Sequence, residues 1–446
     1  MRPRRIPVAS IQTPAHDRSA FESAWPRILA SVDEAARAGA KLIVLPEGTV
    51  PGYVLGTEPV PSELLDDARA ALAVSARRYE ATIVYGTALH FGGETFNAAA
   101  VIGPDGTRLG SASKRFLWHF DRRWFAAGTE LEPLETPVGK LGLLVCADGR
   151  IPSIAATLVE RGAEILVMPT AWVTSGRDPG NRENVQADLM VNVRARENGV
   201  PFVAANKAGV ELASVAYCGK SALVDANGAF VARAGEAEAQ ILSGTLELGN
   251  PVHASRHVFA PTEADLPRQR PAAARIAFTP ATDAVELARL RELAAVADAD
   301  GLLDATQALH SDGERGIELA GVRAAVVGWE SLRSARGLVA ARLAGIDLFI
   351  CGPAPGEPEW LVPFARTRAM ELRAYVVAFA DARRAFAVDP EGVVVAGTFE
   401  GFRMAAFAYD AARAAATRVA PATDVLAGLR DAEAIRSRAP GARLVV

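Results

Sequence analysis

Residues 141–148 read LGLLVCAD, a continuous apolar run that ends in a cysteine and an aspartate. A run of this kind is typical of a strand that is buried on both faces of a parallel sheet. A helix is expected next, at residues 153–161, and a further apolar strand at residues 164–168. Strand, helix and strand in this order form a β-α-β unit. Cys146 is therefore expected at the carboxyl edge of a sheet, where α/β proteins bind their ligands.

Strand and helix patterns also alternate on either side of this unit. Apolar runs that suit strands occur at residues 7–11, 41–45, 82–85, 96–102 and 202–205, with a hairpin at residues 221–233. Patterns that suit helices occur at residues 21–38, 64–79 and 184–197. Repeated β-α-β units predict a layered α/β domain, and the hairpins predict that its sheet is mixed rather than wholly parallel.

The composition excludes several classes of protein. Apolar residues make up 50% of the 446 residues and charged residues 22%, which is typical of a globular chain. A net charge of −4 gives no general attraction to nucleic acid or to an anionic membrane. No apolar run reaches the roughly 18 residues of a membrane-spanning helix, and residues 6–11 are too short for the core of a signal peptide. Three cysteines and six dispersed histidines favour neither a disulfide framework nor a metal enzyme. We therefore expect a cytoplasmic protein with no metal and no nucleic-acid or membrane partner.

The second half of the chain repeats motifs of the first half in the same order. The matching pairs are residues 8–14 with 275–280, 194–197 with 368–371, and 223–228 with 387–392. Shared order along the chain indicates an internal repeat. Residues 251–271 are rich in proline and polar residues and predict a linker. We therefore expect a first domain at residues 1–250 and a shortened second domain at residues 272–446, which ends in a helical tail.

Three residues of the first half could carry chemistry. Glu47 follows the strand at residues 41–45, as Cys146 follows its own strand, so its carboxylate could take the proton of the thiol. Lys114 lies in residues 113–125, where charged and aromatic side chains alternate. Each residue also has a simpler interpretation. Cys146 could be a small buried hydrophobic residue, Glu47 an exposed carboxylate in a turn, and Lys114 part of a solvated basic loop. An aromatic and basic run also occurs in RNA-binding proteins, but one short run on an acidic chain does not favour that function.

The order of these motifs resembles the nitrilase superfamily of carbon–nitrogen hydrolases, which includes amidases, N-carbamoyl hydrolases and nitrilases. The motifs are Leu-Pro-Glu at residues 45–47, a lysine at 114 before a Leu-Trp and Trp-Phe-x-x-Gly segment, and Val-Cys-x-Asp at residues 145–148. The resemblance spans residues 5 to about 250. It implies an α-β-β-α sandwich and a cofactor-free reaction on a small amide, carbamoyl compound or nitrile.

The resemblance also implies a role for each residue. Cys146 is the nucleophile, Glu47 the general base, and Lys114 the cation that stabilises the oxyanion, together with the N–H of Ala147. An ordinary thiol has a pKa of about 8.5, so it needs a base or a cation beside it to react at neutral pH. The expected intermediate is a thioester, or a thioimidate from a nitrile, which water activated by Glu47 then hydrolyses.

Three further residues are candidates with an open alternative. Many family members carry a second glutamate after the lysine, whereas this chain has the shorter Asp121, which could instead be a surface carboxylate. In similar carbamoyl-amino-acid hydrolases an arginine near Arg150 holds the substrate carboxylate, although an arginine here could also lie at the surface. Trp172 either lines the pocket or belongs to the core. Asp148 is expected to cap or hydrogen-bond locally rather than to catalyse.

The second half lacks these motifs. It contains no lysine; Gly328 is expected in the place of Cys146, and Asp304 stands where Leu-Pro-Glu would be. We therefore expect a degenerate, noncatalytic copy that pairs with the first half as an intramolecular pseudo-dimer. Further assembly into a homo-oligomer stays open. The alternative functions are a strict nitrilase, an acyl transferase with an acceptor other than water, and a noncatalytic scaffold, and the sequence does not give the substrate.

Overall fold

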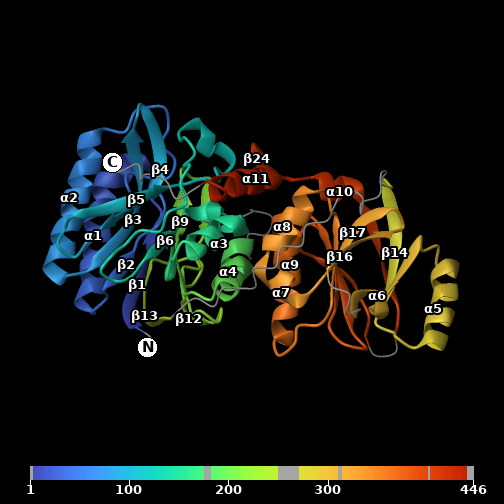
Figure 1. The fold of residues 1–446 in the computed structure, drawn as a ribbon. Coiled ribbons are helices and arrows are strands. Elements are labelled where there is room, and N and C mark those ends of the chain that lie inside the picture. The colour runs from blue at the N-terminus through green and yellow to red at the C-terminus, as the bar shows by residue number, and fades with distance from the viewer. Residues whose placement is uncertain (1–3, 175–181, 250–270, 310–313, 400–401, 439–446) are drawn as a thin grey trace. The chain divides into compact units, whose positions relative to one another are not determined.

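The computed structural model describes residues 4–174, 182–249, 271–309, 314–399 and 402–438. The chain divides into two compact units, which Figure 1 shows in ribbon form. The first unit comprises Met1–His253 with Ala420–Thr423 and Asp431–Val446, and the second comprises Ala254–Val419 with Asp424–Arg430. The expected linker at residues 251–271 lies outside the described residues, except for Pro271.

The first unit contains two sheets. The larger, eight-stranded sheet has the order β10-β9-β1-β2-β3-β4-β5, and β13 pairs antiparallel with β1. Its strands are β1 (Arg4–Pro14), β2 (Leu42–Val44), β3 (Thr82–Phe91), β4 (Glu94–Ile102), β5 (Arg108–Ser113), β9 (Lys207–Glu211), β10 (Val215–Cys218) and β13 (Gln240–Leu248). The second sheet has the order β12-β11-β8-β7-β6. Its strands are β6 (Leu141–Leu143), β7 (Ile165–Pro169), β8 (Phe202–Ala205), β11 (Ala222–Val224) and β12 (Phe230–Arg233).

Helices cover the outer faces of both sheets, so the first unit is an α-β-β-α sandwich. Helices α1 (Phe21–Arg37) and α2 (Ser62–Tyr79) share one apolar core with the larger sheet. Helices α3 (Pro152–Glu160) and α4 (Val191–Asn198) pack on the second sheet. The two sheets meet face to face, and the Ser10 hydroxyl on β1 donates to the carbonyl of Ala204 on β8 at 2.7 Å. Strands β2 and β7 are apolar throughout because both of their faces are covered.

The structure confirms the expected elements of the first half to within a few residues, including the hairpin at residues 221–233. The expected helix at residues 184–197 begins as a π-helical turn, Gln186–Met190, before α4. Strands β9, β10 and β13 were not expected. The buried and exposed positions of β13 partly alternate, so a strand pattern was present in this part of the sequence.

The second unit also contains two sheets. One has the order β15-β14-β22 and the other the order β16-β17-β18-β19-β20-β21. The strands are β14 (Ala273–Thr279), β15 (Gly301–Asp304), β16 (Arg315–Leu319), β17 (Val322–Val327), β18 (Leu348–Cys351), β19 (Tyr375–Phe379), β20 (Ala385–Val388), β21 (Val394–Gly397) and β22 (Ala405–Asp410). The helices are α5 (Ala284–Val296), α6 (Ala305–Leu309), α7 (Trp329–Ser334), α8 (Arg336–Leu343), α9 (Leu361–Leu372) and α10 (Ala411–Ala415).

The strand directions of the two units can be compared directly. Strands β17, β18 and β19 run parallel and are followed by antiparallel β20 and β21, as β6, β7 and β8 are followed by β11 and β12. Strand β14 pairs parallel with β15 and antiparallel with β22, as β1 pairs with β2 and β13. The last elements among the described residues are the strands β23 (Arg418–Ala420) and β24 (Thr423–Asp424) and the helix α11 (Val425–Arg436).

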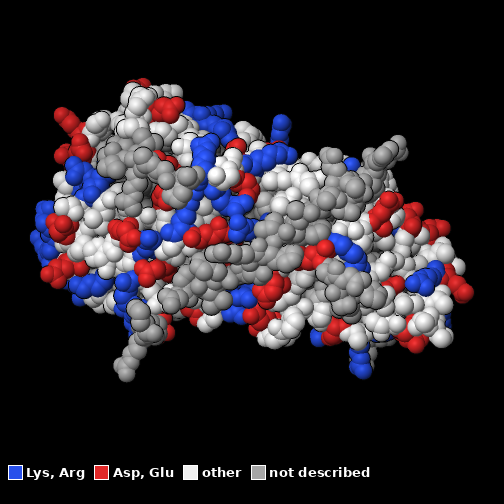
Figure 2. All heavy atoms as spheres, in the orientation of Figure 1, with Lys and Arg blue, Asp and Glu red and all other residues white. Residues whose placement is uncertain are grey.

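The surface is mixed in charge. On the face shown in Figure 2, Lys and Arg side chains are interspersed with Asp and Glu. Among the described residues, no helix combines the length and the apolar character that crossing a bilayer requires.

Candidate active site

Cys146 lies at the turn that follows β6 in the second sheet. It is the first residue of the short 3-10 helix η3 (Cys146–Arg150) and has a φ of +46°. A left-handed conformation in a non-glycine residue costs on the order of 1–3 kcal/mol, and functional sites are one of the places where such residues cluster. Cys146 is 5% exposed, so its side chain is buried. The turn thus places the sulfur at the carboxyl edge of the second sheet, as the sequence predicted.

Glu47 lies just beyond β2 in the opposite sheet and is completely buried. Its Oε1 accepts hydrogen bonds from Asn97 Nδ2 at 2.6 Å and from Lys114 Nζ at 2.8 Å. Its Oε2 is buried and has no hydrogen-bond partner among the described residues. Strand β3 passes so close to this turn that a Cβ on Gly86 would lie 2.4 Å from the Cα of Glu47. The carboxylate is therefore held firmly and keeps one oxygen free to take a proton.

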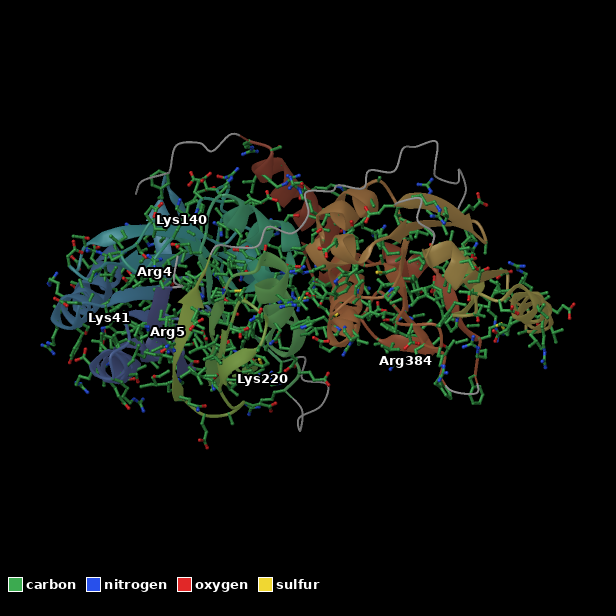
Figure 3. All side chains as sticks on the ribbon, turned by 60° about the horizontal axis from the view of Figure 1, so that its bottom comes forward. Arg4, Arg5, Lys41, Lys140, Lys220 and Arg384 are labelled. Carbon is green, nitrogen blue, oxygen red and sulfur yellow. The ribbon has the colours of Figure 1, made fainter. Side chains whose placement is uncertain are left out.

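Lys114 follows β5 and is also completely buried, in contrast to Lys41 and Lys140 at the periphery of the first unit (Figure 3). Its Nζ lies 2.8 Å from Glu47 Oε1 and 2.7 Å from Asp121 Oδ2. Asp121 belongs to the 3-10 helix η2 (His119–Arg123), and it is 0% exposed. Asp121 is thus a buried partner of the lysine, at the position where the resemblance implied a second acid.

The charges of this cluster set its protonation. Burial raises the pKa of Glu47, and the charge of Asp121 adds to this effect, while Lys114 opposes it. Burial alone would lower the pKa of Lys114, but Asp121 and Glu47 hold it well above its usual value. Burial and the charge of Glu47 raise the pKa of the Cys146 thiol to about 12. The resting sulfur is therefore a thiol, and a base must remove its proton before it can attack.

Asp148 joins the cysteine turn to the lysine segment. Its Oδ1 accepts from the backbone N–H groups of Arg115 and Phe116 at 2.9 and 2.8 Å, and its Oδ2 accepts from Val145 N at 3.0 Å. This matches the hydrogen-bonding role expected for it. Because one carboxylate holds both segments, the spacing between the Lys114 and Cys146 segments is fixed by direct contacts.

Arg150 and Ala147 lie on the same turn as Cys146. The Arg150 guanidinium stacks on Trp118, with Cζ 4.5 Å from the ring centroid. Its Nε is buried and has no hydrogen-bond partner among the described residues, and burial lowers its pKa to about 10. Ala147 is the second residue of η3 and is buried. The first N–H groups of a helix have no partner within the helix, so they are free to bind an oxyanion.

Trp172 is 1% exposed and lies just beyond β7. It is joined to the cysteine by Gln186, a residue that the sequence did not single out. When the Gln186 amide is turned so that its nitrogen faces Cys146 and its oxygen faces Trp172, it donates to the Cys146 carbonyl at 2.9 Å and accepts from Trp172 Nε1 at 3.2 Å. Gln186 opens the π-helical turn before α4, and such turns often mark functional sites.

A second buried cluster, which the sequence also did not reveal, adjoins Asp121. The Tyr53 hydroxyl donates to Asp121 Oδ1 at 3.0 Å. The backbone N–H of Tyr53 donates to Glu211 Oε1 at 3.2 Å, and Glu211 Oε2 accepts from Lys207 Nζ and the Tyr217 hydroxyl at 3.2 and 2.6 Å. These residues are far apart in the sequence, so no local pattern indicates the cluster.

The first unit is a layered α/β protein with a cysteine at the carboxyl edge of one sheet, a position where such folds place nucleophiles. Residues 7–251 match the carbon-nitrogen hydrolase family, and the chain belongs to that family. It is thus a hydrolase of carbon–nitrogen bonds other than peptide bonds, within the nitrilase superfamily.

Several proteins resemble the first half of the chain. A hydrolase of the pqqF 5' region from Pseudomonas protegens is 35% identical over 218 residues, which cover 47% of this chain and 72% of the relative. Omega-amidase NIT2 from Danio rerio is 30% identical over 226 residues, which cover 47% of this chain and 78% of the relative. A crystal structure of a carbon-nitrogen hydrolase from Helicobacter pylori G27 has 25% identity and a TM-score of 0.49, over 55% of this chain and 89% of that chain.

Proposed function

We propose that the first unit hydrolyses a small amide or N-carbamoyl compound through a thioester on Cys146. The observation that carries this proposal is the cluster of Glu47, Lys114 and Asp121, buried beside the cysteine turn. Lys114 Nζ lies within 2.8 Å of both carboxylates, and the charges of Glu47 and Lys114 act on the thiol. The similar proteins include an amidase, Omega-amidase NIT2 from Danio rerio, and a nitrilase from Pyrococcus abyssi, so a nitrile substrate is the second candidate.

Each group has one task in the proposed reaction. Glu47 takes the thiol proton through its free Oε2, and the sulfur forms a bond to the carbonyl carbon. Lys114 and the N–H of Ala147 stabilise the oxyanion, an interaction that strengthens in the transition state. The carbon–nitrogen bond then breaks, and the leaving nitrogen takes the proton from Glu47. Water, activated by Glu47, attacks the thioester and releases the acid and the thiol.

We also propose that the substrate carries a carboxylate, which Arg150 binds. A guanidinium can bind a carboxylate through two parallel hydrogen bonds, and the buried Nε of Arg150 has no such partner within the described residues. The stack on Trp118 fixes the plane of the group. The Trp172 Nε1 donates to Gln186, so we propose that Trp172 acts through Gln186 on the cysteine turn.

We propose that the second unit is a shortened, noncatalytic copy of the first. Its strand order supports this, and so does a buried arginine that recurs in both units. Arg194 Nε donates to the Gly149 carbonyl at 2.9 Å, and Nη1 donates to Glu197 at 2.8 Å. Arg368 Nε donates to the Leu332 carbonyl at 2.6 Å, and Nη1 donates to Glu371 at 2.5 Å.

The strand registers support a correspondence between positions of the two units. In the first unit Leu143 pairs with Val167, and in the second unit Val326 pairs with Ile350. Cys146 follows Leu143 by three residues, so on this register it corresponds to Trp329, which follows Val326 by three residues, and not to the expected Gly328. Asp304 corresponds to Glu47, and its Oδ1 accepts from the backbone N–H groups of Thr306 and Gln307 at 3.0 and 3.2 Å. A helix-capping carboxylate and a tryptophan replace the base and the nucleophile. Pairing of the halves as a pseudo-dimer stays a prediction.

The test is ammonia release from matched pairs of amides and nitriles, and from N-carbamoyl compounds, with and without a carboxylate. The proposal expects wild-type turnover of an amide or carbamoyl compound and none by Cys146→Ala. Turnover of nitriles alone would identify a nitrilase. Unchanged turnover by Cys146→Ala, or no turnover of any member, would contradict the proposal.

A further inference from the structure

The last segment of the chain reaches the first unit beside its active site. Residues 420–423 and 431–446 belong to the same compact unit as residues 1–253. Thr423 is 1% exposed, and its Oγ1 accepts a hydrogen bond from the backbone N–H of His119 at 2.7 Å. The same hydroxyl donates to the Pro421 carbonyl at 3.2 Å, which turns its lone pairs toward His119. The two bonded residues lie 304 positions apart in the sequence.

His119 is the first residue of η2, the helix that carries Asp121. The first N–H groups of a helix have no acceptor within the helix, so a partner must come from elsewhere. His119 also has a φ of +46°, a conformation that non-glycine residues adopt only where their surroundings hold them. The Thr423 hydroxyl supplies both the missing acceptor and this restraint.

Two residues after His119, Asp121 contacts the catalytic lysine. Its Oδ2 lies 2.7 Å from Lys114 Nζ and accepts from Trp118 N at 2.8 Å. The direction of η2 therefore sets where Asp121 holds the ammonium. We infer that Thr423 is a positioning residue for the carbon–nitrogen hydrolase reaction, acting through η2 and Asp121 on Lys114. This inference rests on the proposed function, because it assigns Lys114 the role proposed there.

The same tail segment has other anchors, which provide a control. Ser153 Oγ on α3 donates to Glu433 Oε1 at 2.6 Å, and Arg161 Nη2 on the same helix donates to the Arg438 carbonyl at 3.1 Å. These bonds tie the tail to α3 and do not involve η2. Loss of the Ser153 bond should therefore loosen the tail without moving Asp121.

The experiment compares Thr423→Val, Thr423→Ser and Ser153→Ala in the full chain. Thr423→Val keeps the shape of the side chain and removes the acceptor, whereas Thr423→Ser keeps the acceptor. Because small displacements of catalytic groups are costly, we expect Thr423→Val to lower kcat by about 10-fold to 100-fold with little change in KM. Thr423→Ser and Ser153→Ala should keep kcat near the wild-type value. Should Thr423→Val not fold, Thr423→Ala compared with Thr423→Ser tests the same hydroxyl.

A second readout does not require turnover. The rate at which iodoacetamide alkylates Cys146, followed by peptide mass spectrometry, should fall in Thr423→Val because the thiolate is less well stabilised by a displaced Lys114. Wild-type kcat and alkylation in Thr423→Val would overturn the inference. So would an equal loss in Ser153→Ala, which would show that the tail acts only on stability. Absence of wild-type turnover would overturn the proposed function, and the alkylation rates would still test Thr423.

Discussion

At the scale of single residues, the ammonium of Lys114 organises the proposed reaction. It lies between two buried carboxylates, and the three charged groups of this buried cluster carry one net negative charge. Burial disfavours the charged form of a carboxylate, and the neighbouring charge of Asp121 adds to this, so the pKa of Glu47 rises. A base with a raised pKa is better matched to a thiol whose own pKa is about 12.

This charge arrangement predicts the pH dependence of activity. Burial raises the pKa of Glu47 above the ordinary value of 4.5. As the pH falls through that raised pKa, Glu47 becomes protonated and cannot accept the thiol proton, so kcat/KM should decline. For a neutral amide, the acid limb of kcat/KM should thus lie above pH 4.5. A limb at or below that value would contradict Glu47 as the base. Glu47→Gln should lose activity across the whole pH range.

Arg150 predicts a preference that can be measured on paired substrates. Arg150→Lys keeps the positive charge but cannot form the two parallel hydrogen bonds, so KM for an amide with a carboxylate should rise by about 10-fold or more. KM for the matched neutral amide should change little. An equal rise for both substrates would show that Arg150 shapes the pocket rather than binding the carboxylate.

At the scale of elements, strand β3 fixes the turn that carries Glu47. A Cβ on Gly86 would lie 2.3 Å from the Pro46 carbonyl and 2.4 Å from the Cα of Glu47, and both are backbone atoms that cannot move independently. Gly86→Ala should therefore displace Glu47 and lower kcat by about 100-fold. Gly235→Ala is the matched control, because a Cβ added at Gly235 would have no heavy atom within 4 Å apart from those of its own residue and its chain neighbours. Comparable kcat in the two variants would contradict this account of the turn.

The sequence predicts the positions of site residues that follow apolar strands. It does not predict the site residues that are brought there by long-range packing. The positions of Glu47 and Cys146 were predictable because each residue follows a buried apolar strand, β2 for Glu47 and β6 for Cys146. Strand β5 reads RLGSAS and has no such signal. Lys114 was singled out from the aromatic and basic run at residues 113–125, and only the resemblance gave it a role. Asn97 and Gln186 reach the site through long-range packing, which leaves no local pattern.

At the scale of the whole chain, the two units share a buried arginine that holds a backbone carbonyl. Arg194 donates to the carbonyl of Gly149 in η3, which follows β6, and Arg368 donates to the carbonyl of Leu332 in α7, which follows β17. Truncating either arginine to methionine should destabilise its own unit by about 3 kcal/mol, because a buried partner loses its counter-charge. Arg194→Met should also lower kcat, whereas Arg368→Met should not. Thermal unfolding and kcat of both variants would check this, and an equal loss of kcat would contradict a noncatalytic second unit.

The measurement that tests the central claim most directly is intact-mass spectrometry of the full chain, rapidly quenched during turnover of an amide, followed by peptide mapping. A thioester intermediate predicts one added acyl group per chain, on Cys146, with none on Cys218 or Cys351. The adduct should disappear as the substrate is consumed and should be absent in Cys146→Ala. An acyl group on another residue, or steady turnover with no adduct in the wild type and undiminished turnover in Cys146→Ala, would contradict the account.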